Sequence, residues 1–229
     1  DPCLFGRGGE EAEMLADAGI AFEMVPGVSS VHSVPAYAGI PLTHRQHASS
    51  VTVVTGHEGP SSPANRVCWA GLAEVPGTLV VLMGLRNIQA IAATLIAHGR
   101  SPDTPVAIVS RGTTGRQQTV TGTLDTIAEL ANRSGISPPA VTVIGEVVNL
   151  REQLDWFEQR PLFGRRVAVT QRLDLARPTV AALRERGADV LEVPATRWVP
   201  HPDRARLDKA LAELASYNWI LFSNPLGIE

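Results

Sequence analysis

Glycine-rich turns flanked by charged and polar residues are the stretches of this sequence best suited to binding a ligand. The first is residues 6–11, GRGGEE, and a later one is residues 110–118, SRGTTGRQQ. Glycine allows the backbone N–H groups of such a turn to approach an anion closely, most often between a strand and a helix. A short motif of this kind also fits a purely structural turn, so each turn is a candidate site only.

The elements expected around the first turn are incomplete. A helix after it is indicated by Glu10 and Glu11, which suit a positive helix N-terminus, and by Gly19, which suits a helix end. The strand that should lead into the turn is missing, and the chain begins with Asp1 rather than methionine. We therefore expect residue 1 to lie inside a motif and the chain to be a fragment.

The cysteines and histidines give no metal-binding pattern. Cys3 and Cys68 are the only cysteines, and they form no disulfide framework. Neither His44 nor His57 has a partner at a spacing typical of metal ligands, and both fit structural histidines as well as functional ones. We expect no metal site.

Composition and charge narrow the class of protein. Of the 229 residues, 44% are hydrophobic and 19% charged, which is normal for a globular protein with a sizeable core. The net charge of −3 gives no basic field for nucleic acid. No apolar run approaches the roughly 20 residues of a membrane span, and the N-terminus lacks the pattern of a signal peptide. We expect a cytoplasmic protein that binds neither nucleic acid nor membranes.

Short apolar strands alternate with helical patterns along the first two thirds of the chain. This alternation predicts an α/β architecture with a parallel or mixed sheet. Several of the strands end in a glycine-containing turn, and ligands of open α/β sheets tend to bind at such strand ends. Strands are expected at residues 22–25, 51–54, 78–83, 105–109, 118–121 and 140–144, and helices at residues 88–98 and 123–132.

A second unit begins after the break at Arg160-Pro161. Its pattern is βαβαβ, and a sheet of three strands is small, so we expect this unit to be cut short as well. The expected strands are residues 166–170, 189–193 and 219–222, and the expected helices are residues 177–186 and 204–216. The predicted domains are residues 1–158 and 165–229, joined by a linker at residues 159–164.

Six motifs follow one another in the first 120 residues: DPCLFGRGGEE, VPGVSS, AYAGIPLTHR, VTGHE, MGL and SRGTTGRQQ. Their order resembles that of the tetrapyrrole methylase family, most closely its uroporphyrinogen-III C-methyltransferase branch, up to about residue 158. The resemblance implies a two-lobed α/β fold, here with a truncated N-terminal lobe. It also implies S-adenosyl-L-methionine-dependent methylation of uroporphyrinogen III to precorrin-2, on the way to sirohaem or cobalamin.

The resemblance also implies which residues contact the cofactor in the cleft between the lobes. Asp1 could accept hydrogen bonds, Met83 could offer an adaptable apolar surface, and Gly112 could permit close approach of the backbone. We expect all but the terminal Asp1 to line one pocket; the alternative is that Met83 is a core residue and the serines cap a helix. The implied cofactor-binding residues are Asp1, Leu4, Ser29, Ser30, Met83 and Gly112.

Substrate binding follows from the eight carboxylates of uroporphyrinogen III. Arginine matches a carboxylate with two parallel hydrogen bonds, so Arg7, Arg45 and Arg111 are candidates, with Arg7 free to point at the substrate. Each could equally be a solvated surface arginine. The family's GxGPGD loop is absent, and no lysine precedes Lys209. We therefore assign no catalytic residue and expect this chain alone to be inactive.

The second unit resembles the beginning of uroporphyrinogen-III synthase, in PLFGRRVAVTQ, GADVLEVPATRWVP and LASYNWILFSNPLGIE. The resemblance implies substrate contacts at Thr170, Ser223 and Asn224, although Ser223-Asn224-Pro225 could also be a plain turn. A bifunctional methyltransferase and synthase, homodimeric at full length, is the resulting hypothesis. The alternatives are another precorrin methyltransferase, or a module that binds a tetrapyrrole or S-adenosyl-L-methionine without turnover.

Overall fold

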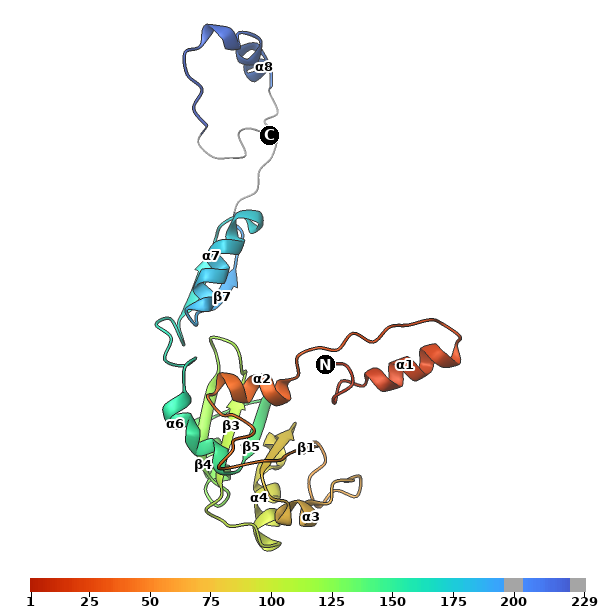
Figure 1. Ribbon diagram of the computed structural model, residues 1–229. Helices are drawn as coiled ribbons and strands as arrows, with labels where there is room; N and C mark the ends of the chain where they lie inside the picture. The colour runs from red at the N-terminus through yellow and green to blue at the C-terminus, as the bar shows by residue number, and fades with distance from the viewer. Residues whose placement is uncertain (196–203, 223–229) are drawn as a thin grey trace.

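The computed structural model describes residues 1–195 and 204–222, and its larger sheet is mixed and has five strands between residues 51 and 144 (Figure 1). The strand order is β1-β2-β5-β3-β4; β1 pairs with β2 in parallel, and the other pairs are antiparallel. Strands β1, β2 and β3 therefore run in one direction and end at the same edge of the sheet. The strands are β1 (Val51–Thr55), β2 (Thr78–Leu82), β3 (Pro105–Ser110), β4 (Gln118–Thr123) and β5 (Ala140–Ile144).

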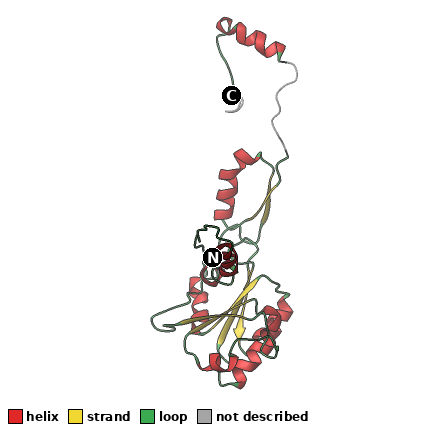
Figure 2. Ribbon diagram, turned by 90° about the vertical axis from the view of Figure 1, so that its right-hand side faces the viewer, coloured by secondary structure: helices red, strands yellow, loops and turns green. Residues whose placement is uncertain are grey.

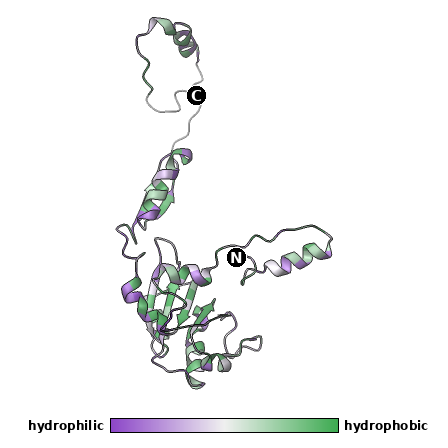
Figure 3. Ribbon diagram, in the orientation of Figure 1, coloured by the Kyte–Doolittle hydropathy of each residue, from purple (hydrophilic) through white to green (hydrophobic). Residues whose placement is uncertain are grey.

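Helices cover both faces of this sheet, which confirms the mixed α/β architecture (Figure 2). Alternate residues of each strand point to opposite faces. In β2, for example, Val81 packs with the helices of one face, whereas Val80 packs with those of the other. Figure 3 shows most strands of the five-stranded sheet as largely hydrophobic. One face carries α3 (Trp69–Glu74), α4 (Ile88–Ala97) and α5 (Ile127–Ser134); the other carries α2 (Ser30–Tyr37) and the 3-10 helix η2 (Glu146–Leu150).

The expected helix at residues 123–132 begins four residues later than its sequence pattern indicates. Thr123 is the last residue of β4, where it pairs with Pro105 of β3. Its hydroxyl and that of Thr126 lie 3.1 Å apart, and Thr126 precedes the first residue of α5. The pairing between strands therefore outweighs the helical spacing at this position.

Helix α1 (Gly8–Asp17) projects away from the sheet, and a long irregular segment connects it to α2 (Figure 1). It ends as expected, with Gly19 in the left-handed conformation at φ 66°. The strand expected at residues 22–25 is absent; Phe22, Met24 and Val25 are exposed in irregular backbone. A strand requires partners for its backbone N–H and C=O groups, and no strand in the described part of the chain pairs with this segment.

The second unit contains a parallel pair of strands, β6 (Arg166–Val169) and β7 (Asp189–Glu192), connected by α7 (Leu173–Glu185). It follows the short helix α6 (Arg151–Leu154), and α8 (Ala205–Ala212) and the 3-10 helix η3 (Leu214–Ser216) come later. The third strand, expected at residues 219–222, is absent, and Trp219 is 84% exposed. No helix of the described residues has the length and apolar character needed to cross a membrane.

Candidate functional site

A cavity of about 930 Å³ lies at the edge of the sheet where β1, β2 and β3 end and β5 begins. His57 follows β1, Met83 follows β2 and Arg111 follows β3, so the strand direction brings all three to this edge. Helix α2 contributes Ser30 and two further residues of the wall. A site at the carboxyl ends of strands is common in open α/β sheets.

Three residues of the cavity wall have left-handed backbone although none is glycine. They are Met83 with φ 57°, Arg111 with φ 50° and Thr113 with φ 69°. Such conformations cost of order 1–3 kcal/mol each and gather at functional sites. Met83 is 50% exposed, so it is not the core methionine that the alternative interpretation expected.

The cavity wall is positively charged. Arg86, in the 3-10 helix η1 (Leu85–Asn87), lines the cavity with Arg111 and Arg116, and no Asp or Glu of the described chain is in this lining. Arg116 also lies 3.5 Å from Asp189, which is outside the lining. A concave surface with charge of one sign attracts ligands of the other. Neither Arg86 nor Arg116 is among the residues expected from the sequence, although Arg86 directly follows MGL and Arg116 lies within SRGTTGRQQ.

Of the residues expected to bind the cofactor, Ser30, Met83 and Gly112 meet in this cavity. Gly112 also has a packing role, because a Cβ there would lie 2.5 Å from Cγ1 of Val34 in α2. Ser29 does not line the cavity. It is the N-cap of α2, and its Oγ accepts a hydrogen bond from the N–H of Val31 at 3.2 Å.

The first turn lies next to the segment that leads into the cavity wall. The carboxylate of Asp1 accepts hydrogen bonds from the N–H groups of Cys3 at 2.8 Å and Gly27 at 3.2 Å. Gly27 immediately precedes Val28, which lines the cavity. Leu4 is 40% exposed and is not part of the lining.

Arg7 is not free, contrary to expectation. Its Nη2 lies 2.6 Å from Oε2 of Glu10, and both side chains are exposed. The hydrogen bond from Arg7, and then its charge, lower the pKa of the Glu10 carboxyl group. Arg7 directly precedes α1, and Glu10 lies three residues later in its first turn. This spacing brings the side chain of Glu10 within reach of the side chain of Arg7.

The remaining expected substrate contacts lie outside the cavity lining. Arg45 is exposed in a turn. This turn is closed by a hydrogen bond of 2.8 Å from the N–H of His44 to the C=O of Ala48. Thr170 is exposed directly after β6. Ser223 and Asn224 lie outside the described residues, and the described residues contain no group of His, Cys, Asp and Glu side chains that could hold a metal ion.

Comparison with known proteins identifies the family. The model of the tetrapyrrole (corrin/porphyrin) methylases matches residues 1–128. A uroporphyrinogen-III C-methyltransferase of Bacillus subtilis is 39% identical over 224 residues, which are 98% of this chain and 46% of the relative. A S-adenosyl-L-methionine-dependent uroporphyrinogen III methyltransferase of Methanosarcina barkeri is 50% identical over 160 residues, which are 70% of this chain and 62% of the relative. The chain thus spans about half of the first relative and under two thirds of the second.

Solved structures agree with this assignment. The uroporphyrin-III C-methyl transferase of Thermus thermophilus, complexed with S-adenyl homocysteine, superimposes with a TM-score of 0.56 at 38% identity, over 66% of this chain and 64% of that one. Cobalt precorrin-4 methyltransferase superimposes with a TM-score of 0.59 at 26% identity, over 65% of this chain and 62% of that one. From the family match and the shared fold, we conclude that this chain belongs to the tetrapyrrole methylase family.

Proposed function

We propose that the chain is part of a S-adenosyl-L-methionine-dependent C-methyltransferase that acts on uroporphyrinogen III. The observation that carries the proposal is the cavity at the strand ends, where Ser30, Met83 and Gly112 meet beside several arginines. The relatives of Bacillus subtilis and Methanosarcina barkeri bear this activity in their names. The precorrin methyltransferase alternative has weaker support, because the cobalt precorrin-4 enzyme is only 26% identical.

The residues of the cavity fit the proposed cofactor. The hydroxyl group of Ser30 can bond to its polar groups, while the half-exposed Met83 and the neighbouring Leu85 offer apolar surface. When bound, S-adenosyl-L-methionine supplies an electrophilic methyl group. The residues of this chain bind and orient it and exclude water from part of its surface.

The arginines of the cavity suit a substrate with many carboxylates. Arg86 and Arg111 can each hold a carboxylate by paired hydrogen bonds, which fixes the orientation of the ring as well as binding it. Arg116 is shared with Asp189, whose carboxylate lies 3.5 Å from its Nε. Arg45 remains a candidate at a distance from the cavity lining. We assign no catalytic acid or base. It stays a prediction that residues 1–229 alone bind the cofactor and the substrate without turnover.

The second unit belongs to the same proposal. The Bacillus subtilis relative aligns over 98% of the chain, and the porphyrin biosynthesis protein HemD of Ruminiclostridium josui is 38% identical over all of it, 45% of its own length. This supports one longer protein that contains both units. We propose that residues 165–229 begin a uroporphyrinogen-III synthase domain, and that the full-length protein is a homodimer.

Cofactor binding is tested by titrating residues 1–229 with S-adenosyl-L-homocysteine in a calorimeter. We expect Met83→Ala to weaken binding about tenfold, because it removes apolar contact from the cavity wall. Met14→Ala, at a methionine of α1 that is 74% exposed, should change nothing. Equal affinities of both variants and the unmodified chain would remove Met83 from the site, and no binding by the unmodified chain would contradict the proposed cofactor for residues 1–229.

Substrate binding is tested with uroporphyrin III as a stable probe. We expect Arg111→Gln to weaken its binding tenfold or more, in keeping with about 1.5–3 kcal/mol for a hydrogen bond to a charged group. Arg45→Gln is the comparison variant, and a similar loss there would show that the substrate extends beyond the cavity. Precorrin-2 formation by residues 1–229, followed by its absorbance, would contradict the prediction that this chain lacks turnover.

A further inference from the structure

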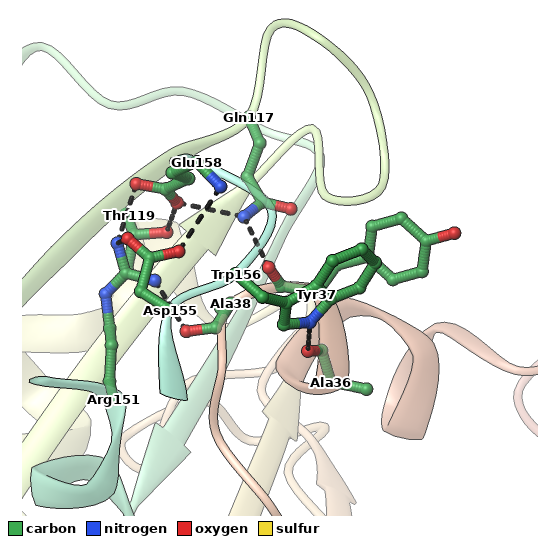
Figure 4. Close-up of polar contacts among 9 residues, drawn as sticks. All are labelled: Ala36, Tyr37, Ala38, Gln117, Thr119, Arg151, Asp155, Trp156 and Glu158. Carbon is green, nitrogen blue, oxygen red and sulfur yellow. Dashed lines mark hydrogen bonds and ion pairs between the residues drawn. The ribbon is translucent and has the colours of Figure 1, made fainter. Parts of the chain in front are cut away.

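A partly buried polar cluster, with Glu158 at its centre, lies next to the turn that lines the cavity (Figure 4). One carboxylate oxygen of Glu158 accepts a hydrogen bond from Nη2 of Arg151 at 2.6 Å. The other accepts from Oγ1 of Thr119 at 2.6 Å and from Nε2 of Gln117 at 2.9 Å. Arg151 also donates from Nη1 to the C=O of Ala38, just after α2, at 2.5 Å. The side chains of Arg151 and Glu158 are only 14% and 18% exposed.

Gln117 connects this cluster to the cavity. It is 4% exposed, and besides Glu158 its Nε2 reaches the C=O of Tyr37 at 3.3 Å. Its Oε1 accepts a hydrogen bond from the backbone N–H of Thr113 at 2.9 Å. Its own backbone N–H donates to the C=O of Thr114 at 2.9 Å, so Gln117 closes the turn from both its side chain and its backbone.

The partners of Gln117 fix the orientation of its amide group. The carboxylate of Glu158 and the C=O of Tyr37 can only accept hydrogen bonds, so the NH₂ group must face them. This leaves Oε1 for the N–H of Thr113, a β-branched residue in the left-handed conformation. Without this acceptor, the N–H of Thr113 would lose its hydrogen-bond partner, while the bonds from Oγ1 of Thr114 to the C=O of Arg111 and from the N–H of Gln117 to the C=O of Thr114 would remain.

We propose that Gln117 is a positioning residue of the cavity. Glu158 sets the direction of its amide group, and the amide holds residues 111–114 in the shape that presents Arg111 and Thr113 to the ligand. The identity of that ligand rests on the proposed function, whereas the positioning of the turn does not. A purely structural role would affect the stability of the fold but leave the geometry of this turn unchanged.

The first test compares Gln117→Met with Gln118→Met, a substitution of the next residue, which is exposed at the start of β4. Amide hydrogen exchange, followed by NMR, should be at least tenfold faster for Thr113 in Gln117→Met, with the amides of β3 as the internal measure of folding. Binding of S-adenosyl-L-homocysteine should weaken at least threefold. Gln118→Met should match the unmodified chain. Unchanged exchange at Thr113 in Gln117→Met would overturn the proposal.

The second test exchanges the two side chains. Gln117→Glu places two carboxylates against each other and should accelerate exchange at Thr113. Adding Glu158→Gln restores one donor between the two groups and leaves an oxygen for Arg151, so protection at Thr113 should recover in part, because the carboxylate at position 117 still faces the C=O of Tyr37. If the double variant exchanges as fast as Gln117→Glu, Glu158 does not orient the amide and the proposal fails. If the unmodified chain does not bind S-adenosyl-L-homocysteine, the proposed cofactor fails for residues 1–229, and the exchange data still decide the positioning role.

Discussion

At Gly112 the missing side chain leaves room for helix α2, because a Cβ would lie 2.5 Å from Cγ1 of Val34. From the sequence, Gly112 is expected in the site only because it would let the backbone approach a ligand closely. A pattern of residues can indicate that the backbone comes close to something, yet it does not reveal which neighbour fills the space. The structure supplies that neighbour, and it belongs to the chain itself.

We predict that Gly112→Ala lowers the stability of the fold by about 1–3 kcal/mol, the usual cost of forcing an extra group into a packed region. Val34→Ala in the same chain should recover part of this loss, because it removes the methyl groups that the new Cβ would meet. Thermal unfolding followed by circular dichroism measures both effects. Gly9→Ala is the control, since a Cβ at Gly9 in α1 meets nothing within 4 Å. Equal melting temperatures for the Gly112 variant and the control would contradict the assigned contact.

The sequence could predict the position of a candidate residue at a strand or helix end, but not whether its side chain binds a neighbouring residue instead of a ligand. Ser30, Met83 and Gly112 come together because each follows a strand end or begins a helix, which the order of motifs indicates. Ser29 and Arg7 differ, since one caps a helix and the other pairs with Glu10. Whether Ser29 and Arg7 form these contacts depends on the geometry of a single helical turn, which a sequence motif does not specify.

Among the elements, the central strands follow their sequence patterns closely. Strand β5, expected at residues 140–144, has those bounds in the structure, and its apolar residues divide between the two faces. The patterns at residues 22–25 and 219–222 are similar, but neither segment forms a strand. Apolar composition favours a strand, whereas the strand itself exists only where a neighbour completes its hydrogen bonds. The sequence of one segment does not contain that information.

Aromatic rings join α2 to the segment after α6. Phe157 is 3% exposed, and its ring centroid lies 4.8 Å from that of Tyr37 and 5.6 Å from that of Phe163. Nε1 of Trp156 donates to the C=O of Ala36 at 3.0 Å (Figure 4). The ring packing and this hydrogen bond together hold the end of α2 near the polar cluster around Glu158.

We predict that Phe157→Ala destabilises the fold by about 3–5 kcal/mol, because it leaves a cavity among these rings. The comparison variant is Phe22→Ala. Phe22 is 46% exposed in irregular backbone, so its loss should cost less than about 0.5 kcal/mol. Chemical denaturation monitored by tryptophan fluorescence compares the two. A similar shift for both variants would show that the aromatic contact contributes nothing specific.

Over the whole molecule, the turn that lines the cavity also contacts the second unit. The C=O of Gly115 accepts a hydrogen bond from the N–H of Gly164 at 3.2 Å. Arg116 lies 3.5 Å from Asp189 of β7, which also pairs with Arg166 of β6 at 2.7 Å. The sequence predicted two units and a break near Arg160-Pro161, but it gave no sign of this contact, because residues 115 and 189 share no motif.

A methyl group at Gly115 should loosen the second unit from the first. A Cβ there would collide with the backbone of Asp189 and of the preceding Ala188, and backbone cannot move aside as a flexible side chain can. We predict that Gly115→Ala speeds tryptic cleavage after Arg165 and Arg166 several-fold, since both arginines are exposed and lie where the two units join.

Cleavage after Arg100 is the internal reference, because its side chain donates to the C=O groups of Leu72 and Gly77 within the first unit. Gly9→Ala serves as the matched substitution and should leave both rates unchanged. Equal cleavage after Arg165 and Arg166 in the two variants would mean that the contact at Gly115 does not hold the units together. A rise at Arg100 as well would instead place the damage within the first unit.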